Sequence, residues 1–366
     1  MSPRILGAPF ITAASILLGC NFPTELPIRY ETEHLEIGTE FDDSLFCRGD
    51  LLELERRVAR TEDELEFTLK ETYTVYVWSD ESWGSGAAKN CGPGDALGCT
   101  RKSRATIWTT RFSLEHELVH AVIGKSRLHP FFEEGLAEVY GGGQTRFGQS
   151  APSANSSTDR ASADVQTAAH FLRWLRERWG PHYLALLART EDGFDDFEAV
   201  YGMSINAAEQ LYFAEAPYAY AAFDDCDAGD LAAADIADRW VDQIELDCDA
   251  GADTLNAGDG IIVHRSLNIS EAGYYSVMTD GEWFDIYRCG ARFEDVPGPD
   301  SWADDVPSSH AGYPSSAYRH YLGAEVHHLF FEVGRHDIGV GILGHGQGVA
   351  NVAIWPSLAP TPEDSE

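Results

Sequence analysis

The segment His116-Glu117-Leu118-Val119-His120 has the pattern HExxH and lies between two residues typical of helix ends. With Ser113 before it and Gly124 after it, we expect a helix from Leu114 to about Ile123. On a helix, positions four apart project from the same face, so both imidazoles can reach one metal ion. The glutamate of the segment would then lie within range of a water molecule on that metal.

A second acidic segment follows within a short distance. Pro130 is suited to begin a helix, Phe131–Tyr140, which the glycines at 141–143 would end. This helix carries Glu133 and also Glu134 and Glu138, which are four positions apart and share a face. Zinc needs at least three protein ligands, and a catalytic site keeps its fourth position open. The second helix therefore offers the missing ligand.

HELVH followed fourteen positions later by EGLAE resembles the gluzincin zinc peptidases, the thermolysin-like clan, over roughly residues 30–215. The resemblance implies one catalytic Zn²⁺, with His116, His120 and Glu134 as its ligands and Glu138 orienting a ligand histidine. Glu133 remains a competing third ligand, because sequence does not fix the register of the helix. The implied activity is peptide-bond hydrolysis, in which zinc lowers the pKa of a bound water to about 7 and Glu117 is the general base.

The chain departs from this family at one place. Gluzincins usually have a downstream Tyr or His that stabilises the tetrahedral intermediate, and small members are expected to have a Tyr early in the following helix. Here that stretch reads DVQTAAHF (164–171) and contains no Tyr. His170 and Tyr140 are the two candidates to replace it. The strand expected at Arg104–Thr110 is either an edge strand that aligns an extended peptide or a plain core strand.

The rest of the chain divides into segments that differ in composition and in the pattern of their apolar residues. Helices are predicted at Leu51–Glu66, Asp164–Trp179 and Ile205–Phe213, with a strand at Thr72–Trp78. The acidic stretch after residue 221 is interpreted as a linker, although Ile236–Leu246 could form a helix. Short strands separated by turns then predict an all-β sandwich: IIVHRSLNI (261–269), GYYSVMT (273–279), EWFDIYRC (282–289), VHHLFFEV (326–333) and DIGVGIL (337–343).

The expected fold class is therefore α+β. A gluzincin-like metallopeptidase domain, with a small sheet, the HExxH helix and further helices, is placed at residues 30–220. An acidic linker at 221–258, an all-β sandwich at 259–356 and a tail at 357–366 follow it.

The first twenty residues have the features of an export signal. Arg4 is their one charged residue, and Ile5–Leu18 is mostly apolar but too short to span a bilayer. Leu17-Leu18-Gly19-Cys20 resembles a bacterial lipobox, in which the cysteine is lipidated. We expect a lipoprotein signal peptide at 1–19 and a tether at 20–29. The protein would be exported and attached through Cys20 to a lipid bilayer of the bacterial cell envelope, on its periplasmic or cell-surface side.

The other cysteines are expected to form disulfides. The chain has seven cysteines, and removing Cys20 leaves an even number, as in many exported proteins. Cys91 and Cys99 close a loop rich in Gly and Pro and form the best local pair. A bond between Cys248 and Cys289 would link strands of the β region.

Composition excludes some classes of protein. Of the 366 residues 44% are hydrophobic and 23% are charged, which is globular composition. Sixty acids against 26 Lys and Arg give a formal net charge of −34, which repels phosphate backbones and argues against a nucleic-acid partner. The expected partner is a peptide or protein substrate. The alternative is an inactive metallopeptidase scaffold that serves as a surface-binding lipoprotein.

Overall fold

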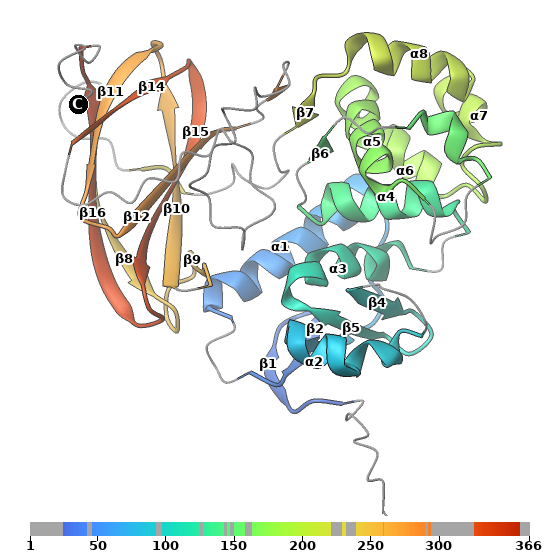
Figure 1. The fold of residues 1–366 in the computed structure, drawn as a ribbon, viewed down its shortest axis with the longest axis horizontal. Helices are drawn as coiled ribbons and strands as arrows, with labels where there is room; N and C mark the ends of the chain where they lie inside the picture. Colours follow the sequence, from blue (N-terminus) through green and yellow to red (C-terminus); the bar gives the residue numbers. More distant parts are fainter. Residues whose placement is uncertain are drawn as a thin grey trace, which may run out of the picture.

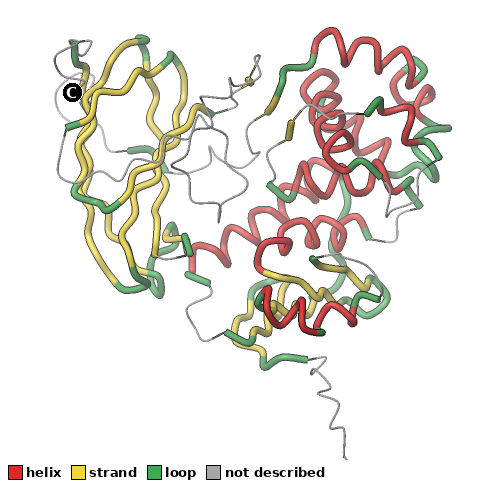
Figure 2. The backbone as a smooth tube through the Cα atoms, in the orientation of Figure 1, coloured by secondary structure: helices red, strands yellow, loops and turns green. Residues whose placement is uncertain are grey.

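The computed structural model of the chain has a mixed α+β architecture. Figures 1 and 2 show helices gathered in one part of the molecule and a strand-rich body beside them. The described residues are 25–41, 46–92, 97–124, 127–142, 145–146, 150–157, 163–220, 229–231, 239–258, 260–289, 292–293 and 326–358. The predicted signal peptide and the predicted lipidation site, Cys20, lie outside them. Among the described helices, none has the length and apolar character to cross a membrane.

A five-stranded sheet in the order β1-β2-β3-β5-β4 forms the base of the N-terminal part. Strands β2, β3 and β5 run parallel, whereas β1 and β4 are antiparallel to their neighbours. The strands are β1 (Ile28–Glu31), β2 (Leu35–Thr39), β3 (Tyr73–Trp78), β4 (Gly98–Arg101) and β5 (Thr106–Thr110). Strand β1 begins inside the predicted tether, so the tether ends before residue 28.

Helices cover both faces of this sheet. Helices α1 (Arg48–Leu65) and α3 (Leu114–Ile123) share a buried apolar core with one face. The short helix α2 (Asp80–Ser85) packs against the other face, where Trp83 meets Tyr76 and Trp108. Because α3 is the HExxH helix, its apolar side fixes it to the sheet and leaves its histidines on the side away from the strands.

The remaining helices form a separate layer with its own core. They are α4 (Pro130–Tyr140), α5 (Val165–Trp179), α6 (Pro181–Ala188), α7 (Phe197–Tyr201) and α8 (Ile205–Glu215). Gly135 allows α4 to lie very close to α5, since a Cβ at that position would be 2.8 Å from the carbonyl carbon of Ala168. The glycine of EGLAE therefore sets how tightly the acidic helix packs.

The C-terminal body consists of two four-stranded antiparallel sheets around one apolar core, as predicted for a sandwich. The sheet orders are β12-β15-β10-β9 and β14-β11-β16-β8. The strands are β8 (Trp240–Asp247), β9 (Thr254–Asn256), β10 (Gly260–Ile269), β11 (Gly273–Thr279), β12 (Trp283–Arg288), β14 (His327–Phe331), β15 (Gly334–Leu343) and β16 (Gln347–Pro356). A small sheet of β6 (Thr145–Arg146), β7 (Ala219–Tyr220) and β13 (Arg292–Phe293) links this body to the helices.

Two predictions for the acidic stretch are wrong. The helix suggested for Ile236–Leu246 is strand β8 over its described part, with Ile244 and Leu246 buried and Gln243 and Glu245 exposed. This alternation has the period of a strand, and β8 pairs with β16 along its length. The linker predicted at 221–258 therefore overlaps the sandwich, because β8 and β9 both belong to its sheets.

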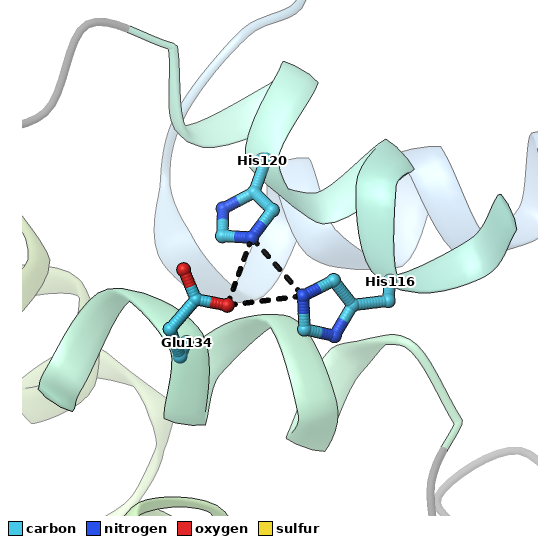
Figure 3. A group of neighbouring side chains, drawn as sticks. All are labelled: His116, His120 and Glu134. Carbon is cyan, nitrogen blue, oxygen red and sulfur yellow. Dashed lines mark hydrogen bonds and ion pairs between the residues drawn. The ribbon is translucent and has the colours of Figure 1, made fainter. Parts of the chain in front are cut away.

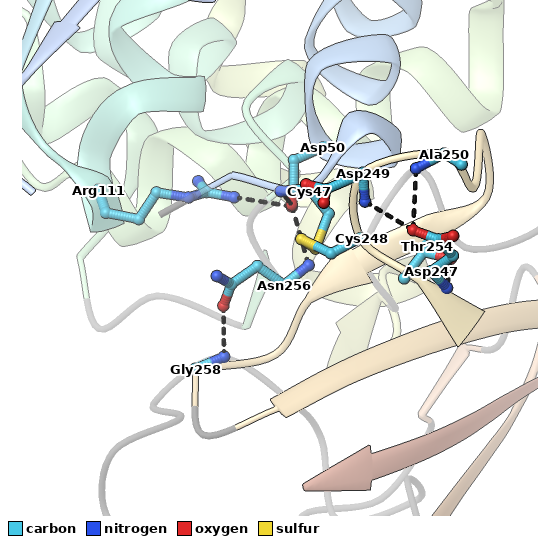
Figure 4. Close-up of a disulfide and its surroundings, with 10 residues drawn as sticks. All are labelled: Cys47, Asp50, Arg111, Asp247, Cys248, Asp249, Ala250, Thr254, Asn256 and Gly258. Carbon is cyan, nitrogen blue, oxygen red and sulfur yellow. Dashed lines mark hydrogen bonds and ion pairs between the residues drawn. A yellow bond between two sulfur atoms is a disulfide. The ribbon is translucent and has the colours of Figure 1, made fainter. Parts of the chain in front are cut away.

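A disulfide joins the sandwich to the N-terminus of α1. Cys47 is bonded to Cys248, 201 positions away, and the buried carboxylate of Asp50 accepts hydrogen bonds from the backbone N–H groups of Cys47 (2.8 Å) and Asn256 (2.9 Å) (Figure 4). Arg111 lies 3.4 Å from the same carboxylate. Burial raises the pKa of Asp50, although Arg111 and the N–H donors oppose this.

The cysteine predictions have mixed outcomes. The local pair Cys91–Cys99 is confirmed. The pair Cys248–Cys289 is wrong, because the end of β8 lies against α1 and Cys248 bonds to Cys47 there. Cys289 is also disulfide-bonded.

Candidate metal centre

Three side chains from α3 and α4 converge on one point. The Nε2 atoms of His116 and His120 lie 3.1 Å apart, and they lie 3.2 Å and 3.4 Å, respectively, from Oε2 of Glu134 (Figure 3). Among the residues that the structure describes, this is the one group of three or more His, Cys, Asp or Glu spaced to hold a metal ion. The two helices thus bring together the three ligands predicted from the sequence.

The spacing of these atoms suits zinc. Ligand atoms at about 2.0–2.1 Å from a tetrahedral Zn²⁺ lie about 3.3 Å from one another, which matches the three distances. The Nδ1 atom of His116 is 3.0 Å from Glu138 and that of His120 is 3.5 Å from Glu133. A neutral imidazole that donates from Nδ1 has its lone pair on Nε2. Three lone-pair donors then face one another, an arrangement that a cation stabilises.

Glu133 and Glu138 are partners of the histidines. Glu133, the alternative third ligand, lies on the Nδ1 side of His120 and accepts a 2.8 Å hydrogen bond from Nζ of Lys102. Burial alone would raise the pKa of Glu133, but His120 and Lys102 outweigh it and lower this pKa to about 2. Glu138 interacts in the same way with His116, as the resemblance implied.

The carboxylates give the site a negative potential. Burial would lower the pKa of His116, but its interactions with Glu134 and Glu138 outweigh burial and raise this pKa to about 10. The pKa of His120 is raised for the same reason, against burial, by Glu133 and Glu134. The carboxylates therefore favour a positive charge at both imidazoles. Either a proton or a metal ion supplies this charge.

Glu117 is close to the ligands in sequence but is not one of them. Its side chain points to strand β4, where the hydroxyl of Thr100 lies 2.8 Å from both Oε2 and the backbone oxygen of Glu117. Gly98 on the same strand leaves room for the carboxylate, since a Cβ there would lie 2.7 Å from Cγ and 2.9 Å from Oε1. Glu117 is 6% exposed, so its position is fixed by packing.

The two candidate stabilisers of a tetrahedral intermediate are engaged elsewhere. His170 is fully buried, its Nδ1 lies 2.8 Å from the hydroxyl of Tyr212, and burial lowers its pKa to about 3. The Tyr140 hydroxyl donates to Glu64, which is also bound by Arg176. The structure therefore gives no support to either residue in that role.

The structure decides between the two interpretations of the strand expected at Arg104–Thr110, and the core strand is the correct one. The strand predicted at Arg104–Thr110 is β5, which lies between β3 and β4 and is a core strand. Strand β4 is the edge of the described sheet next to α3. No strand was expected at β4, because residues 98–101 show no apolar alternation, and neither Thr100 nor Lys102 was a candidate. The one signal in the sequence was the cysteine pair that closes the loop before it.

The chain was compared with known proteins. No protein-family model matches it, and no curated protein sequence is significantly similar to it.

Proposed function

We propose that this protein is a zinc-dependent metallopeptidase of the gluzincin type, exported and attached to the bacterial cell envelope through a lipidated Cys20. The observation that carries the proposal is the convergence of His116, His120 and Glu134 at tetrahedral spacing, beside a buried carboxylate that is not a ligand. The lipobox and the disulfides support export.

The residues have distinct tasks in this proposal. His116, His120 and Glu134 would hold the zinc, which when bound polarises a carbonyl and acidifies a water molecule. Glu117 accepts a proton from the attacking water and passes it to the leaving amine. The outer edge of β4 is unpaired within the described sheet and can add a substrate as a further strand, which favours an extended peptide.

The first test is metal content, measured by mass spectrometry on soluble protein that begins at Asn21. We expect about one zinc per chain, and loss of most of it in His120→Ala and Glu134→Ala, because each removes one of three ligands. The matched control is Glu198→Gln, which changes an exposed glutamate on α7 and should keep the wild-type zinc content. A folded wild-type protein without zinc would overturn the proposal. Zinc that survives Glu134→Ala would overturn the ligand assignment.

Gly98→Ala tests the placement of the general base. The added Cβ overlaps Glu117, so the carboxylate must move, and we expect kcat to fall at least about tenfold while zinc content stays unchanged. Gly84→Ala is the control, because open space surrounds a Cβ at Gly84. Wild-type kcat in Gly98→Ala would show that the carboxylate need not occupy this position.

One observation favours the alternative function of an inactive, surface-binding scaffold. Among the described residues, the two side chains expected to stabilise a tetrahedral intermediate are engaged in the helical core. A screen of peptide and protein substrates with zinc-loaded protein separates the two functions, since the inactive scaffold cleaves none of them.

A further inference from the structure

Strand β4 presents alternate residues to the metal centre. Gly98 and Thr100 contact Glu117, and Lys102, two positions further along, contacts Glu133. Cys99, between them, packs on the opposite face of the sheet. Side chains of a strand alternate between its faces, so one face of β4 and of the turn after it is directed at α3 and α4.

Lys102 connects this strand to a ligand histidine. Its Nζ lies 2.8 Å from Oε1 of Glu133, and the same oxygen lies 3.5 Å from Nδ1 of His120. The side chains of Lys102 and Glu133 are 19% and 7% exposed, so solvent screens this ion pair less than a surface pair. The ammonium holds the carboxylate on the Nδ1 side of the His120 imidazole, at ion-pair distance.

Such a contact has a known effect on metal sites. A carboxylate at the second nitrogen of a ligand histidine fixes the tautomer and orientation of the ring, and its loss typically weakens metal binding 10–100-fold. For His116 this partner is Glu138 of the neighbouring helix α4. For His120 the partner is Glu133, and the lysine that holds Glu133 comes from the turn directly after β4.

We propose that Lys102 is a positioning residue that acts through Glu133 on His120, so that the edge strand β4 and the metal site form one unit. This inference rests on the proposed zinc site. In a peptidase, it would also mean that the strand which aligns the substrate orients a metal ligand.

The test measures the dissociation constant of Zn²⁺ alone by competition with a chelator. We expect Glu133→Gln to weaken zinc binding 10–100-fold and Lys102→Met to weaken it about tenfold. Because Lys102 acts through Glu133, Lys102→Met should add almost nothing in the Glu133→Gln background. Lys102→Arg should restore most of the affinity, since it keeps the charge and the donors. Arg104→Met is the control, because it removes an exposed cation from the same turn.

Several results would overturn the inference. They are an unchanged or tighter zinc affinity in Lys102→Met, an equal loss in both backgrounds, and no recovery in Lys102→Arg. Thermal unfolding of each metal-free variant identifies general loss of structure. If the wild type binds zinc but cleaves no substrate, the peptidase function fails, while these affinities still decide the role of Lys102.

Discussion

Glu117→Gln is expected to retain zinc and to lose about 10²–10⁴-fold in kcat, the usual contribution of a general base. The amide has the shape of the carboxylate and can still interact with the hydroxyl of Thr100, so the local packing should survive. It cannot accept a proton from water at neutral pH. The proposed zinc ligands on α3 and α4 are not altered.

Zinc content and kcat should be measured together for this variant. Glu198→Gln, an exposed position on α7, is a suitable control and should behave like the wild type. If Glu117→Gln cleaves peptides at the wild-type rate, another group is the base. If the variant loses zinc instead, Glu117 supports the metal and the division of roles given above is wrong.

Removing the Cys47–Cys248 disulfide is expected to lower the free energy of unfolding by about 5 kcal/mol. In the chain-entropy description, a cross-link restricts the unfolded chain more when it closes a longer loop, and here the two residues are 201 positions apart. Cys47→Ala with Cys248→Ala removes the bond and leaves small apolar side chains at two buried positions. Denaturant unfolding, with separate probes of the helices and the sandwich, measures the effect.

The chain contains a matched control for this experiment. Cys91 and Cys99 are 8 positions apart, so removing their bond should cost roughly 2–3 kcal/mol on the same description. Equal losses for the two pairs would contradict the entropic explanation. Removing the Cys47–Cys248 bond should also let the sandwich unfold separately from the helices, because this bond joins the two parts.

The two helices of the candidate metal centre were predictable because their end signals are local. The structure places α3 at Leu114–Ile123 and α4 at Pro130–Tyr140, as the sequence indicated. Ser113 is an instructive detail, since its hydroxyl does not cap α3 but donates to the backbone oxygen of Leu97. The helix begins where expected, with a different partner for that hydroxyl.

Features that depend on contacts distant in sequence were not predictable. Glu245 and Asp247 of β8 alternate with the buried Ile244 and Leu246, and in the sequence such acids resemble the charges of a linker. The partner of Cys248 follows from how the sandwich meets α1, and six cysteines allow 15 pairings. The choice between Glu133 and Glu134 depends on the rotation of α4 relative to α3, which packing against α5 determines.

Helix α1 runs from the sandwich to the helical layer and is a rigid connection between them (Figure 1). Its 18 residues span about 27 Å. One end is fixed by the Cys47–Cys248 bond and Asp50, and near the other end Glu64 binds Arg176 of α5. Asp50 also binds Arg111, three residues before α3. A pulling force on the sandwich would therefore be carried by a covalent bond and along the axis of α1. The candidate metal centre would then keep its orientation relative to the sandwich under that force.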